Sequence, residues 1–310
     1  MAGVLQGFSI IALIIAVGVL LDRTGRLGPS GRHVLNALAF RVATPALLFG
    51  LMHTAELDVL FSAQFAVTAV GMVLMALVYA AIGAVARWGA GPTTIGALCA
   101  SFVNSGNLGI PIAVYVLGDG TLVAPVMLVQ QLIMSPVMLA VLDVASRGPD
   151  APRLRWWQLL VRPFANPIVI GALSGLALNV AGIRLPGFAL EPILLIGGIS
   201  VPAVLIAFGM SMRDSAVPLR GPERGQVLLA SALKALVHPL VAWAIGLLAF
   251  GLDARTLLVV VVTAALPAAQ NIYNYAAVAG VGERLARESI LLTTIASVPV
   301  IVLATLLLHP

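Results

Sequence analysis

Two short polar clusters interrupt an otherwise apolar sequence, about 163 residues apart. The first consists of Asn104, Ser105, Asn107, Gly109 and Pro111. The second consists of Pro267, Gln270, Asn271, Tyr273 and Asn274. Proline and glycine free backbone N–H and C=O groups inside a helix, and the N-terminal end of a half-helix has a partial positive charge. With amide and hydroxyl side chains beside it, such a site suits the carboxylate of a small organic anion.

The elements that hold these clusters are expected to be membrane-spanning helices. The 310 residues are 61% hydrophobic and 9% charged, with mean hydropathy +1.09, whereas soluble domains carry about 25% charged residues. Because about 20 apolar residues cross a bilayer, we expect ten spans, at 4–21, 34–53, 63–86, 94–118, 121–143, 164–181, 189–210, 226–250, 256–280 and 287–308. Irregular backbone at membrane depth persists only inside protein or beside a cavity, and paired breaks in two halves indicate a transporter's substrate site.

The start of the chain and its single cysteine narrow the possibilities. The first apolar segment has no basic start, and Asp22-Arg23 follows it where a cleavage site of small residues would stand, so we expect a retained helix. The lone Cys99 excludes an internal disulfide and a cluster of thiolate metal ligands. We therefore expect no metal and no cofactor.

The arginines are distributed by loop. With the N-terminus outside, the outer loops contain only Arg184 and Arg255. The cytoplasmic loops contain Arg23, Arg26, Arg32, Arg87, Arg147, Arg153, Arg155, Arg162, Arg213, Arg220, Arg224, Arg284 and Arg287. This bias follows the positive-inside rule and places both termini outside. Because the basic residues form no single patch, the net charge of +5 does not predict binding of nucleic acid.

The spans divide into two halves of five, residues 1–145 and 164–310, joined by a basic cytoplasmic loop at 146–163. Because five is odd, the second half must run opposite to the first. Several features recur at about half the chain length: Thr44–Met52 and Val201–Met210, Ser135-Pro136 and Ser297-Val298-Pro299, Gly118 and Gly280. One such echo could arise by chance alignment of apolar helices, but several in register favour an inverted repeat.

The segment Gly106-Asn107-Leu108-Gly109-Ile110-Pro111 resembles the GNxGxP signature of the auxin efflux carrier family, whose bacterial members include malate and malonate permeases. The resemblance covers essentially the whole chain and includes LNALAFRVATPALLF, LKALVHPL and the proline- and asparagine-containing ninth span. It implies an all-α fold of ten helices in which spans 4 and 9 are broken and cross at the substrate site. It further implies a scaffold and homodimer surface of spans 1, 2, 6 and 7, and a transport domain of spans 3–5 and 8–10 that moves as an elevator. The bacterial inner membrane is the implied location. The central loop is shorter than that of many plant members.

Ionisable residues inside the spans are few. Lys234 and His238, four residues apart, share one helical face and are candidates for coupling or gating. Lys234 could instead extend to the headgroups, and His238 could be a buried structural histidine. Arg41 is expected to reach the headgroups or contact a second subunit. No Asp or Glu stands clearly at mid-membrane, since Asp143 is close to an inner end, which disfavours a carboxylate cation site; a coupled proton or sodium ion stays open.

Further polar residues flank the two clusters. Gln130 and Gln131 in span 5, and Thr293, Thr294 and Ser297 in span 10, are either neutral ligands or interhelical contacts. Gln131 is included among the candidate substrate-binding residues. The segment Gly171–Gly175 has the spacing of a close helix-packing motif.

These features predict a secondary active transporter of small organic anions, of auxin-like or dicarboxylate type, with Asn107 and Asn271 as the foremost substrate contacts. A passive channel or membrane sensor on the same fold is the alternative. An intramembrane serine hydrolase using Ser105 or Ser174 with His238 is a weaker one, because neither serine stands in a nucleophile-type sequence. The sequence has no GxxxxGK[ST] loop for ATP. It leaves the identity of the substrate and the direction of transport open.

Overall fold

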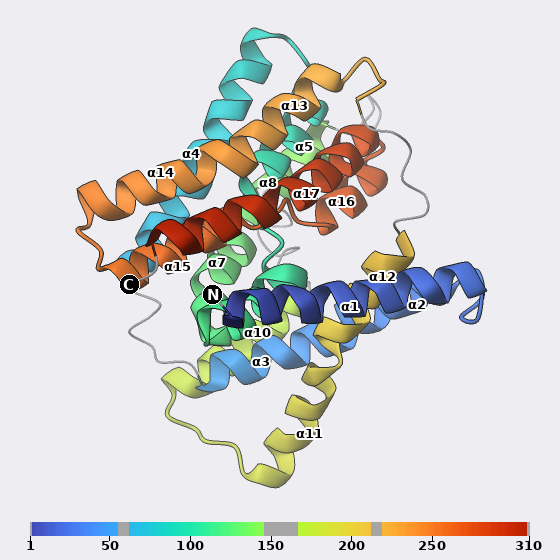
Figure 1. Cartoon of the computed structure of the whole chain (residues 1–310), viewed down its shortest axis with the longest axis vertical. Helices are drawn as coiled ribbons and strands as arrows, with labels where there is room; N and C mark the ends of the chain where they lie inside the picture. Colours follow the sequence, from blue (N-terminus) through green and yellow to red (C-terminus); the bar gives the residue numbers. More distant parts are fainter. Residues whose placement is uncertain (1, 55–61, 146–166, 212–218, 309–310) are drawn as a thin grey trace. The chain divides into compact units, whose positions relative to one another are not determined.

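The computed structural model describes residues 2–54, 62–145, 167–211 and 219–308, and it is helical apart from one isolated β-bridge (Figure 1). The basic loop expected at 146–163 lies outside these ranges. The chain divides into two compact units. The first unit contains Met1–Val59, Gly106–Ala124 and Val161–Ala216, and the second contains Leu60–Ser105, Pro125–Leu160 and Val217–Pro310.

The first unit is built from the N-terminal helices and from those that follow the central loop. Its α-helices are α1 (Ala2–Thr24), α2 (Gly31–Leu38), α3 (Thr44–Thr54), α6 (Ile110–Ile112), α10 (Pro167–Val180), α11 (Gly187–Gly198) and α12 (Ser200–Ser211). The π-helical segments η1 (Ala39–Ala43) and η4 (Ala113–Leu117) and the 3-10 turn η5 (Gly120–Val123) complete it. A further π-helical segment, η3 (Ser105–Gly109), stands at the boundary of the two units in the sequence.

Glycines set the packing distance between α10 and α3. A Cβ atom at Gly171 would overlap the carbonyl oxygen of Pro45, and one at Gly175 would overlap that of Phe49. Glycines at this spacing let two helix backbones touch. The small-residue motif predicted at Gly171–Gly175 is therefore confirmed as a helix-packing site.

The second unit contains the remaining helices. They are α4 (Ala63–Val85), α5 (Ala90–Ser101), α7 (Ala124–Leu128), η6 (Val129–Met134), α8 (Ser135–Ala145), α13 (Arg224–Ala232), η9 (Leu233–Val237), α14 (His238–Ala244), η10 (Ile245–Ala249), α15 (Ala254–Ala265), α16 (Asn271–Ala279) and α17 (Glu283–Leu308). The helix α5 packs against α4, α8, α13 and α17, and its residues contribute heavily to the core. Gly96 of α5 lies against the fully buried ring of Tyr79 from α4, where a Cβ atom would overlap the ring.

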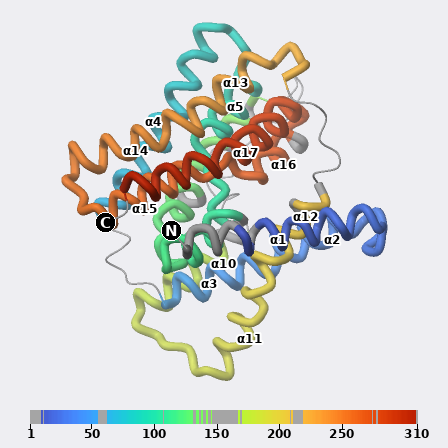
Figure 2. Tube along the Cα trace, viewed as in Figure 1, coloured from blue at the N-terminus to red at the C-terminus, as the bar shows by residue number. Residues whose placement is uncertain are grey.

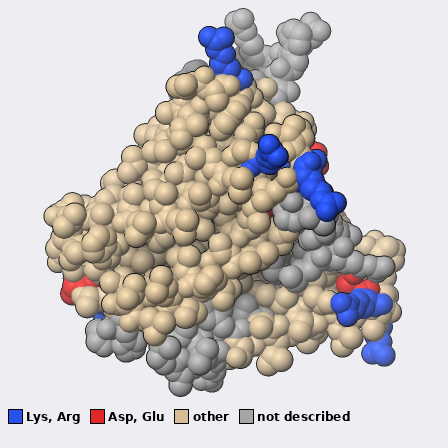
Figure 3. Space-filling view, turned by 45° about the horizontal axis from the view of Figure 1, so that its top comes forward, with Lys and Arg blue, Asp and Glu red and all other residues tan. Residues whose placement is uncertain are grey.

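Five helical stretches among the described residues are long and apolar enough to cross a membrane: Gly31–Thr54, Ala63–Val85, Gly187–Ala207, Arg224–Ala249 and Glu283–Leu308. The apolar helices Ile170–Val180 and Ala254–Ala265 are shorter. Most of the face drawn in Figure 3 carries no charged side chain. These properties are those of a polytopic membrane protein.

Two of the predicted spans are interrupted in the structure. The stretch 94–118 is divided between α5 and η3, and the stretch 256–280 between α15 and α16. Each stretch ends at a glycine with positive φ, +84° at Gly118 and +66° at Gly280. A left-handed residue closes a helix because it turns the chain away from the axis, and only glycine adopts that conformation without strain.

Candidate functional site

The first interruption begins where α5 ends at Ser101. Phe102 has extended backbone angles, φ −70° and ψ 134°, and helical structure resumes at Ser105. The second interruption begins where α15 ends at Ala265. Leu266 has φ −55° and ψ 146°, because the residue before a proline avoids the α conformation. Pro267 thus accounts for the end of α15, and Figure 2 traces the chain through these helices.

The two interruptions are hydrogen-bonded to each other. Val103 and Ala268 form an antiparallel β-bridge, and the amide of Asn104 donates to the carbonyl of Pro267 over 2.8 Å. All these residues belong to the second unit. The segments that follow α5 and α15 therefore meet within this unit, and each bonds free backbone groups of the other. This meeting point is called the crossing below.

Side chains from neighbouring helices satisfy the rest. The Oε1 atom of Gln130 accepts from the amide of Val103 over 2.7 Å, and its Nε2 atom is 3.1 Å from Ser105 Oγ. The hydroxyl of Thr293 accepts from the amide of Ala268 over 3.1 Å. Thus Gln130 contacts the interruption, whereas the side chain of its neighbour Gln131 lies outside the described part of the structure.

The predicted donors are placed differently from one another. Asn104 and Ser105 are buried at the crossing. Asn271 begins α16, and its Nδ2 atom donates to the hydroxyl of Tyr275 over 2.9 Å. Tyr273 is 38% exposed, and Gln270 is half-buried just before α16.

Three predicted residues, Asn107, Gly109 and Pro111, belong to the first unit. Asn107 and Gly109 are in η3, and Pro111 is in α6. The side chains of Asn107 and Asn274 are outside the described part of the structure.

Lys234 and His238 form a buried pair beside the second interruption. The Nζ atom of Lys234 donates to the carbonyl of Ala264 over 2.5 Å and is 3.1 Å from Nδ1 of His238. The side chain of Lys234 is 0% exposed. The alternative that Lys234 extends to the headgroups is therefore wrong, because the ammonium turns inward to the last turn of α15. Arg41 is exposed on η1.

A small cavity adjoins this pair. Thr68, Val103, His238 and Thr263 are among its lining residues, which all belong to the second unit. Its size is about that of one water molecule. The cavity therefore joins His238 to the first interruption at Val103 but has no room for a dicarboxylate.

The N-terminal end of α15 is held by a cap. Asp253 accepts from the amides of Arg255 and Thr256 over 3.0 and 3.1 Å, and from the hydroxyl of Thr256 over 2.6 Å. The hydrogen bond from the Thr256 hydroxyl, followed by that from its amide, holds the pKa of the Asp253 carboxyl below its usual value. The cap thus fixes where α15 starts, and Pro267 fixes where it ends.

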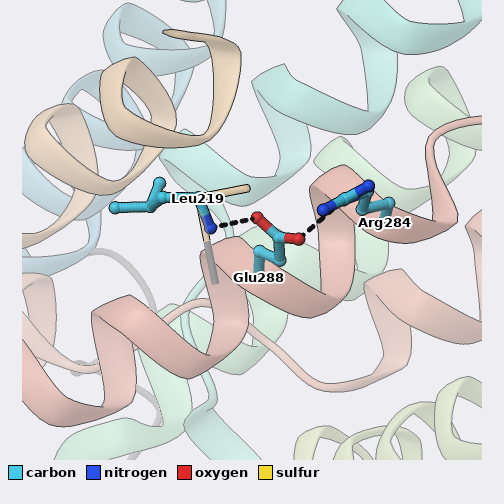
Figure 4. A network of polar contacts seen from close by, with 3 residues as sticks. All are labelled: Leu219, Arg284 and Glu288. Atoms are coloured by element: carbon cyan, nitrogen blue, oxygen red, sulfur yellow. Dashed lines mark hydrogen bonds and ion pairs between the residues drawn. The ribbon is translucent and has the colours of Figure 1, made fainter. Parts of the chain in front are cut away.

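A second polar network, which the sequence analysis does not predict, fixes the start of α17. The buried carboxylate of Glu288 accepts from the amide of Leu219 over 2.8 Å and from Nε of Arg284 over 2.7 Å (Figure 4). Only the i, i+4 spacing of Arg284 and Glu288 could have indicated the ion pair. The network joins the segment before α13 to the first turns of α17.

The serines of the hydrolase alternative have other partners. The hydroxyl of Ser105 is bonded to Gln130, and that of Ser174 donates to the carbonyl of Ile170 over 2.7 Å. The Nδ1 atom of His238 faces Lys234. In the part of the chain that the structure describes, neither serine is paired with this histidine, so the arrangement of a nucleophile and its base is not formed.

Comparisons with known proteins identify the class of protein. A family model described as "Membrane transport protein" matches residues 6–305. A Rhizobium meliloti (strain 1021) protein named "Putative malonate transporter" is 25% identical over 304 residues, which cover 95% of this chain and 91% of that protein. The family is one of transporters and not of enzymes. The chain therefore belongs to the membrane transport protein family, the auxin efflux carrier family, and is an integral membrane transporter.

Proposed function

We propose that this transporter carries small organic anions, with short dicarboxylates such as malonate as the foremost class, by secondary active transport. The observation that carries the proposal is the crossing, at which the interrupted helices bond to each other through Asn104 and Pro267. Uncharged donors and helix N-termini gather there, which suits an anion. The name of the relative from Rhizobium meliloti agrees with a dicarboxylate.

The proposed substrate contacts are the polar residues of the two interruptions: Asn104, Ser105, Asn107, Gly109, Pro111, Gln131, Pro267, Gln270, Asn271, Tyr273 and Asn274. Asn271 stands at the N-terminus of α16, where helix-end amides and its own side chain can act on one carboxylate. Asn107 follows Ser105 by two residues in the sequence.

We further propose ten spans in a five-plus-five inverted repeat, with both termini outside and the protein in the bacterial inner membrane. Supporting this, Gln130 and Thr293, which are separated by the same spacing as the two polar clusters, bond the amides of the two residues paired in the β-bridge, Val103 and Ala268. The proposed mechanism is an elevator: spans 1, 2, 6 and 7 form the scaffold and homodimer surface, and spans 3–5 and 8–10 move. The division into two compact units supports this assignment, although Gly106–Ala124 groups with the first unit.

Uptake into proteoliposomes of purified protein tests the proposal. Labelled malonate, malate and an indole acid would each be offered with imposed pH, sodium or voltage gradients. We expect saturable uptake of a dicarboxylate, and a loss of about 10- to 100-fold in transport efficiency in Asn107→Ala and Asn271→Ala. A hydrogen bond to a charged group contributes about 1.5–3 kcal/mol, and each 1.4 kcal/mol is about tenfold.

Asn36→Ala is the matched control, because Asn36 is exposed on α2. If both interruption variants transport as well as the control, the proposed site is wrong. If flux rises linearly with concentration and never exceeds equilibrium, the passive channel replaces the carrier.

A further inference from the structure

Lys234 is the single lysine of the sequence. It lies in η9, a π-helical segment, and π-helical turns often mark functional positions. Its Nζ atom has two partners among the described residues, the carbonyl of Ala264 and Nδ1 of His238. Neither partner is an anion, so the ammonium has a carbonyl and a base beside it in place of a carboxylate.

The neighbouring sequence supplies no carboxylate. Residues 59–118, 224–252 and 254–282 contain no Asp or Glu. The elements that pack against η9 and α14 include α4, α5, α13, α15 and α17. Their other titratable or charged residues are Tyr79, Cys99, Arg224, Arg255, Glu283, Arg284, Arg287 and Glu288.

These groups are engaged elsewhere or lie at other depths. Tyr79 bonds to the carbonyl of Gln226, eight residues before Lys234 and so about 12 Å away along a helix. Arg255 is nine residues, about 13 Å, before Ala264. Glu288 is bonded to Arg284 and to the amide of Leu219.

Lys234 and His238 can share at most one excess proton. Two positive charges 3.1 Å apart in a buried site repel strongly. The proton can rest on Nζ, with Nδ1 accepting, or on Nδ1, with Nζ accepting. The small cavity that His238 and Thr68 line leaves space for about one water molecule beside the pair.

The pair is connected to the crossing by a short path. Ala264, which accepts from Lys234, is three residues before Pro267, and the carbonyl of Pro267 accepts from the amide of Asn104. A positive charge is stabilising at the C-terminal end of α15, so the proton supports the helix end from which the crossing segment departs. A negative charge at the crossing and a proton on the pair therefore favour each other, and this coupling is reciprocal.

We propose that Lys234 and His238 form a single-proton site that binds one proton together with each transported anion. The proton enters from the side at which the anion binds and leaves on the other side, so transport of a dianion moves one net negative charge. This inference rests on the proposed function and adds its coupling ion.

Paired flux measurements in proteoliposomes test it. Exchange of internal for external labelled malonate needs no net proton movement, whereas accumulation of malonate driven by a pH gradient does. In Lys234→Met we expect exchange at saturating malonate to persist while malonate-driven proton entry, followed with an enclosed pH-sensitive dye, falls at least 10-fold. The malonate concentration that gives half-maximal exchange should rise with pH in the unchanged protein. In this variant it should become independent of pH.

Arg255→Gln is the control, because it removes a cation from the exposed start of α15. It should leave both fluxes unchanged. A purely structural role of Lys234 would reduce exchange and accumulation together, and that result overturns the inference. A His238→Gln variant with the pH profile of the unchanged protein would remove His238 from the site and overturn the pair.

A measurement without transport uses the single lysine. Protein labelled with ¹⁵N-lysine has one side-chain Nζ resonance, which differs between ammonium and amine. In membranes we expect this resonance to change from that of an ammonium to that of an amine as the pH rises. Adding malonate should move this transition to higher pH, because the anion favours the protonated pair. An ammonium signal at every pH, or a transition that malonate does not move, contradicts the inference.

The two proposals fail in different ways. If the unchanged protein shows no exchange of any offered anion, the proposed function fails. If it exchanges malonate but moves no protons, only the coupling inference fails.

Discussion

The two interrupted helices use the same backbone arrangement with different side chains. At the first interruption the amide of Val103 donates to Gln130, and at the second the amide of Ala268 donates to Thr293. Among the described residues, only the second has a cationic side chain at its helix end, where Lys234 bonds to the carbonyl of Ala264. For α5 the described contacts of this region are with neutral groups.

The presence of a charged side chain beside α15 and not beside α5 distinguishes a structural requirement of the interruptions from a functional one. Backbone groups freed in a membrane must be satisfied whatever the protein does, and both interruptions achieve this with neutral side chains. The additional charge beside α15 is not required for that purpose. A nearly symmetric frame can thus carry an asymmetric chemical function, and substitutions at equivalent positions of the two helices should reveal which differences are structural.

The largest expected effect on stability comes from giving Gly96 of α5 the side chain found at the corresponding position of α15. Gly96 of α5 lies against Tyr79. The corresponding residue of α15, found by applying the spacing between the two polar clusters, is the buried Val259. In Gly96→Val the new side chain must overlap the Tyr79 ring, and we expect about 3 kcal/mol or more of destabilisation, since overpacking typically costs about 1–3 kcal/mol and occasionally more. Size-exclusion profiles and apparent melting temperature in detergent would show loss of the folded protein.

Val259→Ala should be milder, at about 2 kcal/mol, because it only removes two methyl groups. Adding Tyr79→Ala to Gly96→Val should recover part of the lost stability. Equal stability of the Gly96→Val and Val259→Ala proteins would show that the close approach of α4 and α5 is not specific to the first half.

An intermediate effect is expected from the side chains that bond the crossing. Gln130→Leu leaves the amide of Val103 without its acceptor and removes the partner of Ser105, whereas Thr293→Val affects the amide of Ala268. Each unsatisfied buried group costs about 1–3 kcal/mol, so we expect Gln130→Leu to lower the apparent melting temperature more. Thr54→Val, exposed at the end of α3, serves as the control. The reverse order would mean that Thr293 holds the crossing and Gln130 is secondary.

The smallest effect is expected at Ser101 and Thr263. Their hydroxyls donate within their own helices, to the carbonyls of Ala97 over 2.7 Å and of Val259 over 2.8 Å. Such bonds add little to helix stability, so Ser101→Ala and Thr263→Val should each change stability by less than about 1 kcal/mol. Thr263 also lines the small cavity. If Thr263→Val slows proton-coupled transport and Ser101→Ala does not, the functional difference between α5 and α15 includes these two hydroxyls as well as Lys234.

The interruptions could be predicted from the sequence because their causes are local. Pro267 and the preceding Leu266 end α15 by backbone sterics alone, and Gly118 and Gly280 end the interrupted stretches for the same kind of reason. The close packing at Gly171 and Gly175 also followed from spacing. Family membership followed from the motif at Gly106–Pro111 and is confirmed by the family match.

The partners of the interruptions could not be predicted, because they depend on helix rotation. Gln130 and Gln131 are adjacent, and about 100° of rotation decides which one faces the crossing; both lie in the π-helical segment η6, which changes that rotation. The position of Lys234 within its helix does not tell whether its side chain turns inward to Ala264 or outward to lipid. The β-bridge of Val103 and Ala268 joins residues far apart in sequence and has no local signal.

The crossing also has a consequence for how the backbone exchanges its hydrogens with water. Interrupted helices usually expose amides that exchange quickly, because local opening there needs little free energy. Here the amides of Val103, Asn104 and Ala268 are each bonded, to Gln130, Pro267 and Thr293. Opening any one of these hydrogen bonds requires a second element to move as well. In D2O, the amides of this irregular backbone should therefore keep their hydrogens about as long as the amides in the core of α5 do.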